Sequence, residues 1–595
     1  MKKFMFLAIL FAACAPKPGP VNTEEISAFE NNLTSVVSFT NDPGWNIEER
    51  MKFYGVPGAS IAVIKDNKIL WSKAYGIMDK ETSEPVTTKT LFQAGSISKP
   101  VAAYVALKEV DNGKINLDTD VNSWLKTWKI PGNEFTAEKK VTLAHLLSHT
   151  GGLTVHGFLG YSPDLPVPTL VQVLDGAPPA NSAPVRVNKT PGGNFRYSGG
   201  GYSVMQQLLI DVNDGKTFPA IAKDLVLGPL EMTSSTYDQP LDAETVKLAA
   251  TGYLPNHEQT KGKRHTYPEM AAAGLWTTAE DLAKFAIEVQ NAAAGKSKII
   301  SKATADRLLT AVDANYALGF GVRDRKGDVY FGHGGWDEGF SSEMVAHRDK
   351  GYGIVVLTNS NHPPFISEVI RAAAKTYNWD NYLPTYTRLP MDTTLFAKVR
   401  GRYRNGTDGR ITITTEGDHL YFKYLRAGRR ELFKISDSTY ISNEEDAPLQ
   451  FKTLTDGQID LVIYDGGNHG GSHPMVKGNE MVPFEHLLAG DFEKALKGYQ
   501  DLLKANPGDF SIAEENLNRQ GYEKLGENVK LARDIFKINM LLYPLSPNVY
   551  DSYADACFED GDKKEALINY KKSLSMDAAN THAKERIAEL ENVPK

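Results

Sequence analysis

Short apolar runs alternate with longer amphipathic stretches over the first two thirds of the chain. Residues 61–64 and 69–71 are apolar and flank a polar turn at 65–68, a pattern that predicts a β-hairpin. The other expected elements of this region are a strand over residues 353–357 and helices over residues 100–110, 278–292 and 365–377. From about residue 25 to 385 we therefore expect an α/β domain built on an antiparallel sheet.

The hydrophobic period becomes two from about residue 395 to 482. Leu420, Phe422 and Tyr424 would share one face of a strand, and Asp456-Gly457 marks a tight turn between two further strands. Several short strands separated by turns are typical of a small antiparallel barrel or sandwich. A proline-containing linker before this region marks its boundary with the α/β domain.

From residue 484 to 595 the pattern is helical and repeats itself. Small residues recur at Ala495, Ala532 and Ala566, which are 37 and then 34 residues apart, and an aromatic residue follows each one four positions later. Small side chains let paired helices approach, and the aromatic ring fills the layer between them. This pattern resembles tetratricopeptide repeats, which implies an all-α repeat block that binds a protein partner. A stabilising cap is the alternative.

The first residues resemble a secretory signal. Lys2 and Lys3 precede an apolar run of ten residues, which spans about 15 Å as a helix and is too short to cross a bilayer. The run ends Phe11-Ala12-Ala13-Cys14, similar to a bacterial lipobox, so we expect residues 1–14 to be a lipoprotein signal peptide with Cys14 lipidated. Cleavage after Ala15 is the alternative. Residues 15–24 would form a tether, and the protein would be exported to the bacterial cell envelope.

Charge and cysteine content narrow the choice of partners. The formal net charge of −7 is modest for 595 residues, and no basic block stands out, so we expect no nucleic acid. Cys14 and Cys557 are the two cysteines, so no internal disulfide is expected. Apart from the lipid anchor, no contact with a membrane is predicted, because no second apolar run reaches 18 residues.

A serine and a lysine three positions apart stand at the start of the predicted helix over residues 100–110. Ser96 and Lys99 would lie on the same helical face, where a neutral lysine amine can take the proton of a serine nucleophile. The helix start also supplies backbone N–H groups for a developing oxyanion. Alone, this spacing arises by chance in a chain of this size and indicates only a capped helix.

Two further motifs follow in order. Residues 192–202 form a glycine-rich segment around Tyr197, in which the glycines allow the backbone to come close to a cleft. Residues 331–336 place His333 beside paired glycines next to a predicted strand. Taken singly, a tyrosine buried under a loop and a histidine in the core are the ordinary explanations.

Together, the three motifs resemble the penicillin-recognising serine hydrolases: class C β-lactamases, D,D-peptidases and related esterases and D-amino-acid peptidases. The phrases at residues 146–153 and 273–278 match the same family, and the resemblance covers about residues 45–375. It implies a β-lactamase-like catalytic domain over residues 25–385. It also implies that the barrel over 395–482 is lipocalin-like, a packing module by default.

The resemblance implies a role for each matching residue. Ser96 would be the nucleophile, with Lys99 and Tyr197 exchanging its proton; which of the two is the base stays open. The backbone N–H groups of Ser96 and Trp336 would form the oxyanion hole. His333 would be a further catalytic residue that orients a carboxylate or assists proton transfer. Phe195, Gly199 and Gly335 would bind the substrate. A histidine at position 333 would be partly charged at neutral pH.

Two departures from the family pattern affect the expected substrate. Gly199 replaces the asparagine that usually ends the second motif, and His333 replaces the lysine of the third. Both favour an esterase or peptidase over an efficient β-lactamase. The prediction is a serine hydrolase that forms an acyl-enzyme from an ester, a D-amino-acid peptide or a β-lactam, without metal or cofactor. The alternative is a sensor of the same fold with slow or absent turnover, coupled to partners through residues 484–595.

Overall fold

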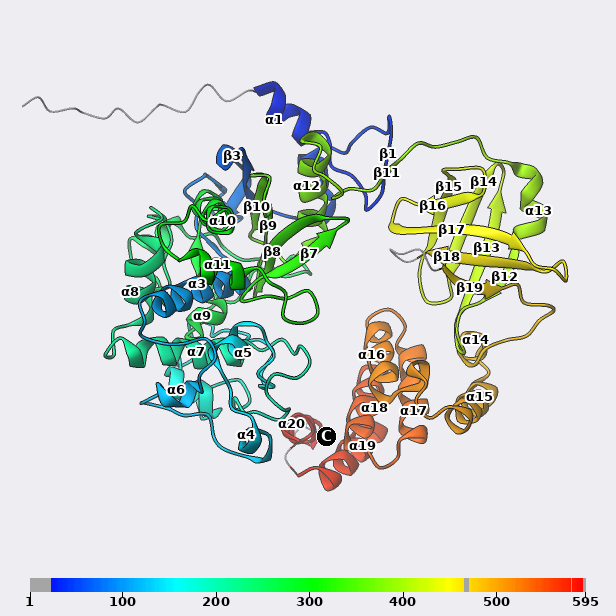
Figure 1. The fold of residues 1–595 in the computed structure, drawn as a ribbon. Coiled ribbons are helices and arrows are strands. Elements are labelled where there is room, and N and C mark those ends of the chain that lie inside the picture. The colour runs from blue at the N-terminus through cyan, green and yellow to red at the C-terminus, as the bar shows by residue number, and fades with distance from the viewer. Residues whose placement is uncertain (1–22, 465–469, 579, 592–595) are drawn as a thin grey trace, which may run out of the picture. The chain divides into compact units, whose positions relative to one another are not determined.

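The computed structural model describes residues 23–464, 470–578 and 580–591 and divides into two compact units, residues 1–384 and 385–595 (Figure 1). The predicted signal peptide, with Cys14, lies outside the described residues. Most of the predicted tether does as well, but its last two residues, Thr23 and Glu24, begin helix α1 (Thr23–Glu30). Within the described residues, every helix is too short or too polar to span a bilayer.

Unit 1 is built on the expected antiparallel sheet. Its seven strands lie in the order β4 (Glu84–Pro85), β3 (Lys68–Asp79), β2 (Gly58–Lys65), β10 (Gly353–Thr358), β9 (Phe340–His347), β8 (Asp328–Asp337) and β7 (Gly321–Arg325). The predicted hairpin is confirmed as β2–β3. Asp66 and Asn67 form its turn with φ angles of 53° and 55°, a left-handed conformation that asparagine and aspartate tolerate.

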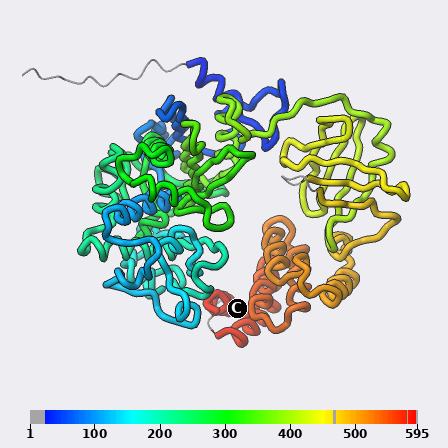
Figure 2. The backbone as a smooth tube through the Cα atoms, in the orientation of Figure 1, coloured from blue at the N-terminus to red at the C-terminus, as the bar shows by residue number. Residues whose placement is uncertain are grey.

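The centre of the sheet joins two distant parts of the chain. β2 pairs with β10, with Ile64 opposite Gly353, and Figure 2 shows these segments side by side. β10 is apolar at nearly every position because helices cover both of its faces. Val355 and Leu357 belong to the core that includes α3 (Ser98–Asp111) and α10 (Ala279–Ala293), whereas Ile354 and Val356 pack under α12 (Pro363–Thr376).

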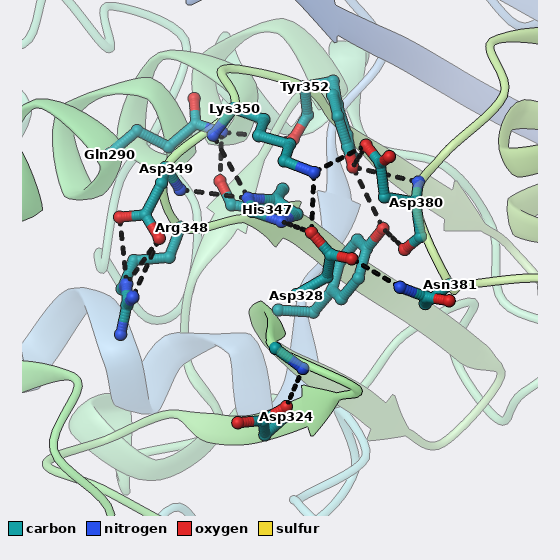
Figure 3. Close-up of polar contacts among 12 residues, drawn as sticks. Gln290, Asp324, Asp328, His347, Arg348, Asp349, Lys350, Tyr352, Asp380 and Asn381 are labelled. Atoms are coloured by element: carbon teal, nitrogen blue, oxygen red, sulfur yellow. Dashed lines mark hydrogen bonds and ion pairs between the residues drawn. The ribbon is translucent and has the colours of Figure 1, made fainter.

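A polar cluster fixes the turn between β9 and β10 (Figure 3). Lys350 pairs with Asp328 at 2.7 Å and with Asp380 at 2.9 Å, which connects the sheet to the segment after α12. Buried His347 accepts the backbone N–H groups of Asp349 and Lys350 on its Nδ1 atom, at 3.0 and 3.1 Å. The cluster fixes one end of β8, β9 and β10 and includes no residue of the Ser96 region.

The first part of unit 2 is a nearly closed barrel of eight antiparallel strands. In order, these are β12 (Gly401–Arg404), β13 (Arg410–Glu416), β14 (His419–Tyr424), β15 (Arg429–Lys434), β16 (Thr439–Ser442), β17 (Glu445–Thr453), β18 (Ile459–Tyr464) and β19 (Gly470–Pro474). Tyr403 on β12 bridges to Met475, directly after β19, and so brings the first and last strands together. Leu420 and Phe422 face the core as predicted. The lipocalin-like assignment stays a prediction.

The second part of unit 2 is helical. Its helices are α14 (Pro483–Leu488), α15 (Phe492–Ala505), α16 (Glu514–Leu525), α17 (Val529–Leu542), α18 (Pro547–Glu559), α19 (Lys563–Met576) and α20 (Thr581–Glu591). The repeated alanines Ala495, Ala532 and Ala566 are fully buried, on α15, α17 and α19. This confirms a helical block with small residues at its packing positions. The tetratricopeptide assignment stays a prediction.

A buried aspartate joins the barrel and the helices of unit 2. Asp408, between β12 and β13, forms an ion pair with Arg426 and accepts a hydrogen bond of 2.8 Å from the Tyr499 hydroxyl on α15. It also accepts the backbone N–H of Phe484 at the start of α14, at 2.9 Å. Because a buried carboxylate must be paired, these contacts make the two parts of unit 2 depend on each other.

Candidate active site

Ser96 lies in a 3-10 turn, η1 (Gly95–Ile97), that leads directly into α3. It is half-buried, whereas all other residues from 91 to 100 are buried, so Ser96 alone in this segment is accessible. Lys99, 2% exposed, donates hydrogen bonds to Ser96 Oγ at 2.9 Å and to the Ala272 carbonyl at 2.8 Å. No described carboxylate forms an ion pair with Lys99. The predicted Ser–Lys contact is therefore present.

Tyr197 lies over Lys99, with the lysine Nζ 4.9 Å from the centre of its ring. The ring of His149 packs against Tyr197 at a centroid distance of 4.2 Å. His149 Nδ1 accepts the backbone N–H of Ser198 at 3.0 Å, and Ser198 caps α7 (Gly199–Val212). The glycine-rich segment therefore places Tyr197 at the Ser–Lys pair, and His149 holds it there.

His333 projects from β8 towards the same place. Its Nδ1 lies 2.5 Å from the Gly334 carbonyl, so this nitrogen carries the proton, and Nε2 accepts the hydroxyl of Tyr316 at 3.0 Å. Burial, with a smaller effect of Lys99, lowers the pKa of His333 to about 3. The expectation of a partly charged histidine is wrong for this structure, because a desolvated imidazole beside a lysine stays neutral at pH 7.

A cavity of about 330 Å³ borders these residues, a size typical of small-molecule sites. Its lining residues include Tyr197, His333 and the predicted Phe195, together with Arg323 and Glu343. The backbone N–H of Phe195 donates to Asp313 at 2.5 Å, which fixes the loop that carries it.

The end of β8 packs tightly against the turn that carries Ser96. A Cβ atom on Gly335 would lie 2.0 Å from the Ala94 carbonyl oxygen, and one on Gly95 would lie 2.5 Å from the Trp336 nitrogen. Only glycines permit this approach, which brings the Trp336 backbone next to the residue before Ser96. Trp336 is 46% exposed. The arrangement suits the predicted oxyanion hole of Ser96 and Trp336, although Gly335 itself serves close packing.

Gly199 does not line the cavity. Its backbone N–H donates to the His156 carbonyl at 2.9 Å, and a Cβ atom would lie 3.0 Å from the Phe158 ring. A side chain at this position would press against Phe158, which would have to move by a few tenths of an ångström.

Three contacts of the site are absent from the sequence prediction. Tyr316 holds His333, His149 holds Tyr197, and the Ala272 carbonyl accepts from Lys99. His149 belongs to one of the matched phrases, and Tyr316 precedes the closely spaced glycines 319 and 321, the same kind of context as Tyr197. The Ala272 carbonyl could not be identified from the sequence, because every residue has a backbone carbonyl.

One group of possible metal ligands occurs in the described residues, far along the chain from Ser96. It consists of Asp551, Asp555 and His582 on the helices of unit 2. These side chains already bond to one another and to Tyr570 and Asn580, so the group is satisfied without an ion.

An antiparallel sheet between helical layers, with a Ser–Lys pair beside a tyrosine that lines a cavity together with a histidine, defines the class of β-lactamase-fold serine hydrolases. The Beta-lactamase family model matches residues 46–377, more than half of the chain. The protein belongs to the β-lactamase family.

Its relatives carry several different names. A penicillin-binding protein of Bacillus subtilis is 22% identical over 454 residues, covering 71% of this chain and 94% of that protein. Protein flp of Staphylococcus aureus is 25% identical over 330 residues, covering 53% of this chain and 62% of its own length. Esterase EstB of Burkholderia gladioli is 38% identical over 96 residues, covering 16% and 24%.

Solved structures are similar as well. The octameric penicillin-binding protein homologue from Pyrococcus abyssi is 24% identical to this chain, with a TM-score of 0.49, and the alignment covers 72% of this chain and 98% of that one.

Proposed function

We propose that this protein is a serine hydrolase in which Ser96 is acylated by an ester or a peptide and water then releases the product. The observation that carries the proposal is the bond of 2.9 Å between Lys99 Nζ and Ser96 Oγ on an otherwise buried segment. A serine hydroxyl is a weak nucleophile until a neighbouring base takes its proton, and Lys99 is in position to do so.

The reaction would proceed in two steps. Ser96 Oγ attacks the substrate carbonyl while its proton passes to Lys99, and the oxyanion is held by the backbone N–H groups of Ser96 and Trp336. Collapse of this intermediate breaks the bond to the leaving group, which receives a proton from Lys99 through Tyr197. Water then attacks the acyl-enzyme by the reverse route and restores Ser96. His333 is neutral, so it provides no positive charge in either step; its ring forms part of the cavity lining.

Two observations favour esters or peptides over β-lactams. Gly199 lies outside the cavity lining and supplies no side-chain amide for a substrate. His333 is neutral where the family usually has a lysine, so this position supplies no cation for the carboxylate of a penicillin. We expect nitrocefin to be hydrolysed far more slowly than p-nitrophenyl acetate.

The test is labelling of the purified protein with a fluorophosphonate, followed by rates on p-nitrophenyl esters, D-Ala-D-Ala peptides and nitrocefin. Ser96→Ala should abolish labelling, and Lys99→Met should slow it by about 10³-fold or more. Ser98→Ala is the matched control, because Ser98 is a neighbouring serine whose hydroxyl accepts the backbone N–H of Leu275. Labelling that survives Ser96→Ala would refute the proposal.

The other parts of the chain add proposals of their own. We infer that Cys14 is lipidated and that the protein is exported to the cell envelope, as the lipobox-like sequence suggests. The helical block over residues 484–595 would bind a protein partner if its tetratricopeptide-like spacing reflects function. Radiolabelled palmitate incorporation, lost in Cys14→Ala, tests the first proposal. A pull-down with and without the helical block tests the second.

A further inference from the structure

One face of three neighbouring strands, β7, β8 and β9, forms the floor of the cavity beside His333. Alternate residues of a strand point to the same face of a sheet, and residues paired across two strands share that face. The pairing brings together on this floor Gly321 and Arg323 of β7, Gly332 and Gly334 of β8, and Glu343 and Val345 of β9. Two opposite charges therefore belong to one cavity floor.

These two charged side chains have no role in the scheme above. The carboxyl group of half-buried Glu343 lies against the backbone of Gly334, because a Cβ atom on Gly334 would be 2.7 Å from Glu343 Oε2. The Gly334 carbonyl also accepts the Nδ1–H of His333, so the carboxyl group lies at the residue that fixes the imidazole. Arg323 is exposed on the edge strand β7. Neither side chain forms a hydrogen bond or an ion pair with a described residue.

The two charges interact at a distance without pairing. Burial raises the pKa of Glu343 to about 7, and Arg323 acts in the opposite direction, so the guanidinium is within electrostatic range of the carboxyl group. Burial also raises the pKa of the Tyr382 phenol to about 12, and Glu343 raises it further while Arg323 lowers it. All three groups thus face one space, in which a molecule that carries both charges can pair with both residues.

The other lining groups of this space are largely aromatic. The rings that line the cavity are those of Phe195, Tyr197, Tyr316, Tyr330 and Tyr382. Arg325 is already engaged, since its guanidinium lies 4.6 Å from the centre of the Tyr382 ring and donates to the Tyr382 carbonyl at 3.4 Å. With a volume of about 330 Å³, the cavity can hold an apolar side chain of moderate size as well as the two charged groups.

We propose that this cavity is a substrate subsite for an amino-acid group with a free ammonium, a free carboxylate and an apolar side chain. Arg323 binds the carboxylate, Glu343 binds the ammonium, and the aromatic rings enclose the side chain. An α-amino acid carries both charges on one carbon atom, so it can lie between the two residues and pair with each. The proposal rests on the proposed function and deepens it, because it names a feature of the substrate that Ser96 would attack.

The test measures binding to the full chain carrying Ser96→Ala, which keeps the cavity and cannot be acylated. The probes are D- and L-phenylalanine, 3-phenylpropanoate, which lacks the ammonium, and phenethylamine, which lacks the carboxylate. In ligand-observed NMR titrations at pH 8, one or both enantiomers of phenylalanine should bind about tenfold or more tightly than either single-charge probe. Equal affinities for phenylalanine and one of the single-charge probes would overturn the proposal.

Two further variants in the Ser96→Ala background identify the partner of each charge. Arg323→Gln should remove the advantage of phenylalanine over phenethylamine, and Glu343→Gln should remove its advantage over 3-phenylpropanoate. Arg348→Gln is the matched control, because its guanidinium pairs with Asp349 at 2.8 Å in the cluster of Figure 3, and both advantages should persist. Advantages unchanged in Arg323→Gln and Glu343→Gln, or lost in Arg348→Gln, would overturn the proposal. If a variant does not fold, the comparison of probes on the unaltered cavity still decides.

Two results separate this proposal from the proposed function. Fluorophosphonate labelling of the wild type without binding of either phenylalanine enantiomer would overturn the subsite and leave the serine hydrolase. Binding with the expected charge dependence, in a protein whose wild type never labels, would refute the proposed function and leave an amino-acid site in the cavity.

Discussion

Among the residues of the site, His333 depends most on a single neighbour. Its Nε2 accepts the Tyr316 hydroxyl, and its Nδ1 is committed to the Gly334 carbonyl, so the neutral ring has one fixed tautomer and orientation. The imidazole ring therefore forms a rigid part of the cavity lining. Tyr316, in the loop before β7, fixes the position of the ring.

Tyr316→Phe tests this dependence. The variant leaves a buried nitrogen acceptor without a partner, which costs about 1–3 kcal/mol. We expect kcat/KM on a p-nitrophenyl ester to fall about tenfold. Tyr352→Phe removes a hydroxyl that bonds to Asp380 in the cluster of Figure 3 and should leave kcat/KM unchanged. Equal rates for Tyr316→Phe and wild type would contradict the role assigned to Tyr316.

The buried side chain of Glu269, directly before α9 (Met270–Ala273), leads to a prediction about stability. Its pKa is raised from 4.5 to about 8 in the folded protein, so the folded state holds this proton more tightly than the unfolded chain. The stability that depends on it is complete below pH 4.5 and is lost as the pH rises to about 8, a change on the order of 5 kcal/mol.

Glu269→Gln removes this titration. In urea unfolding monitored by tryptophan fluorescence, the variant should gain stability relative to wild type between pH 5 and pH 8. A constant difference between the two proteins over that range would show that Glu269 does not titrate in the folded state.

At the scale of elements, the contact between β8 and η1 assembles the site. Gly335→Ala would force the strand away from the Ala94 carbonyl and from Ser342, whose hydroxyl would lie 2.2 Å from the new Cβ. Because this contact places the Trp336 backbone, we expect labelling of Ser96 to slow by about 10²-fold or more.

Gly132→Ala is the control for this substitution. A Cβ atom there would meet nothing within 4 Å, so labelling and thermal stability should stay at the wild-type level. Normal labelling of Gly335→Ala would mean that β8 can move without disturbing the oxyanion hole.

The elements themselves could be predicted because their patterns are local. The hairpin around Asp66 has a turn signal, and the helix behind Ser96 has a continuous apolar face. The contacts of His333 with Tyr316 and of Lys99 with the Ala272 carbonyl could not be predicted, because each partner is brought from elsewhere by the fold. The predicted partial charge of His333 was wrong for the same reason. Burial sets the charge of this imidazole, and burial cannot be deduced from the neighbouring residues in the sequence.

At the scale of the whole molecule, the two units should unfold separately, and Asp408 tests unit 2. Asp408→Asn removes the counter-charge of half-buried Arg426 and weakens the hydrogen bonds that the buried carboxylate accepts from Tyr499 and Phe484, which costs about 1–3 kcal/mol. We expect the thermal transition of unit 2 to move to lower temperature while Ser96 is still labelled at the wild-type rate. Asp418→Asn, at a side chain that is 81% exposed, is the control. A loss of labelling in Asp408→Asn would show that the units are coupled.

The pairing of β2 with β10 also governs how the protein is made. Roughly 290 residues separate Ile64 from Gly353, and a ribosome needs about 15–60 s to add them. Throughout that time β2, an almost wholly apolar strand, has an unoccupied edge that invites aggregation. Protease resistance of the nascent domain should appear only after residue 358 has left the ribosome, because β2 has no partner on that edge until β10 is made.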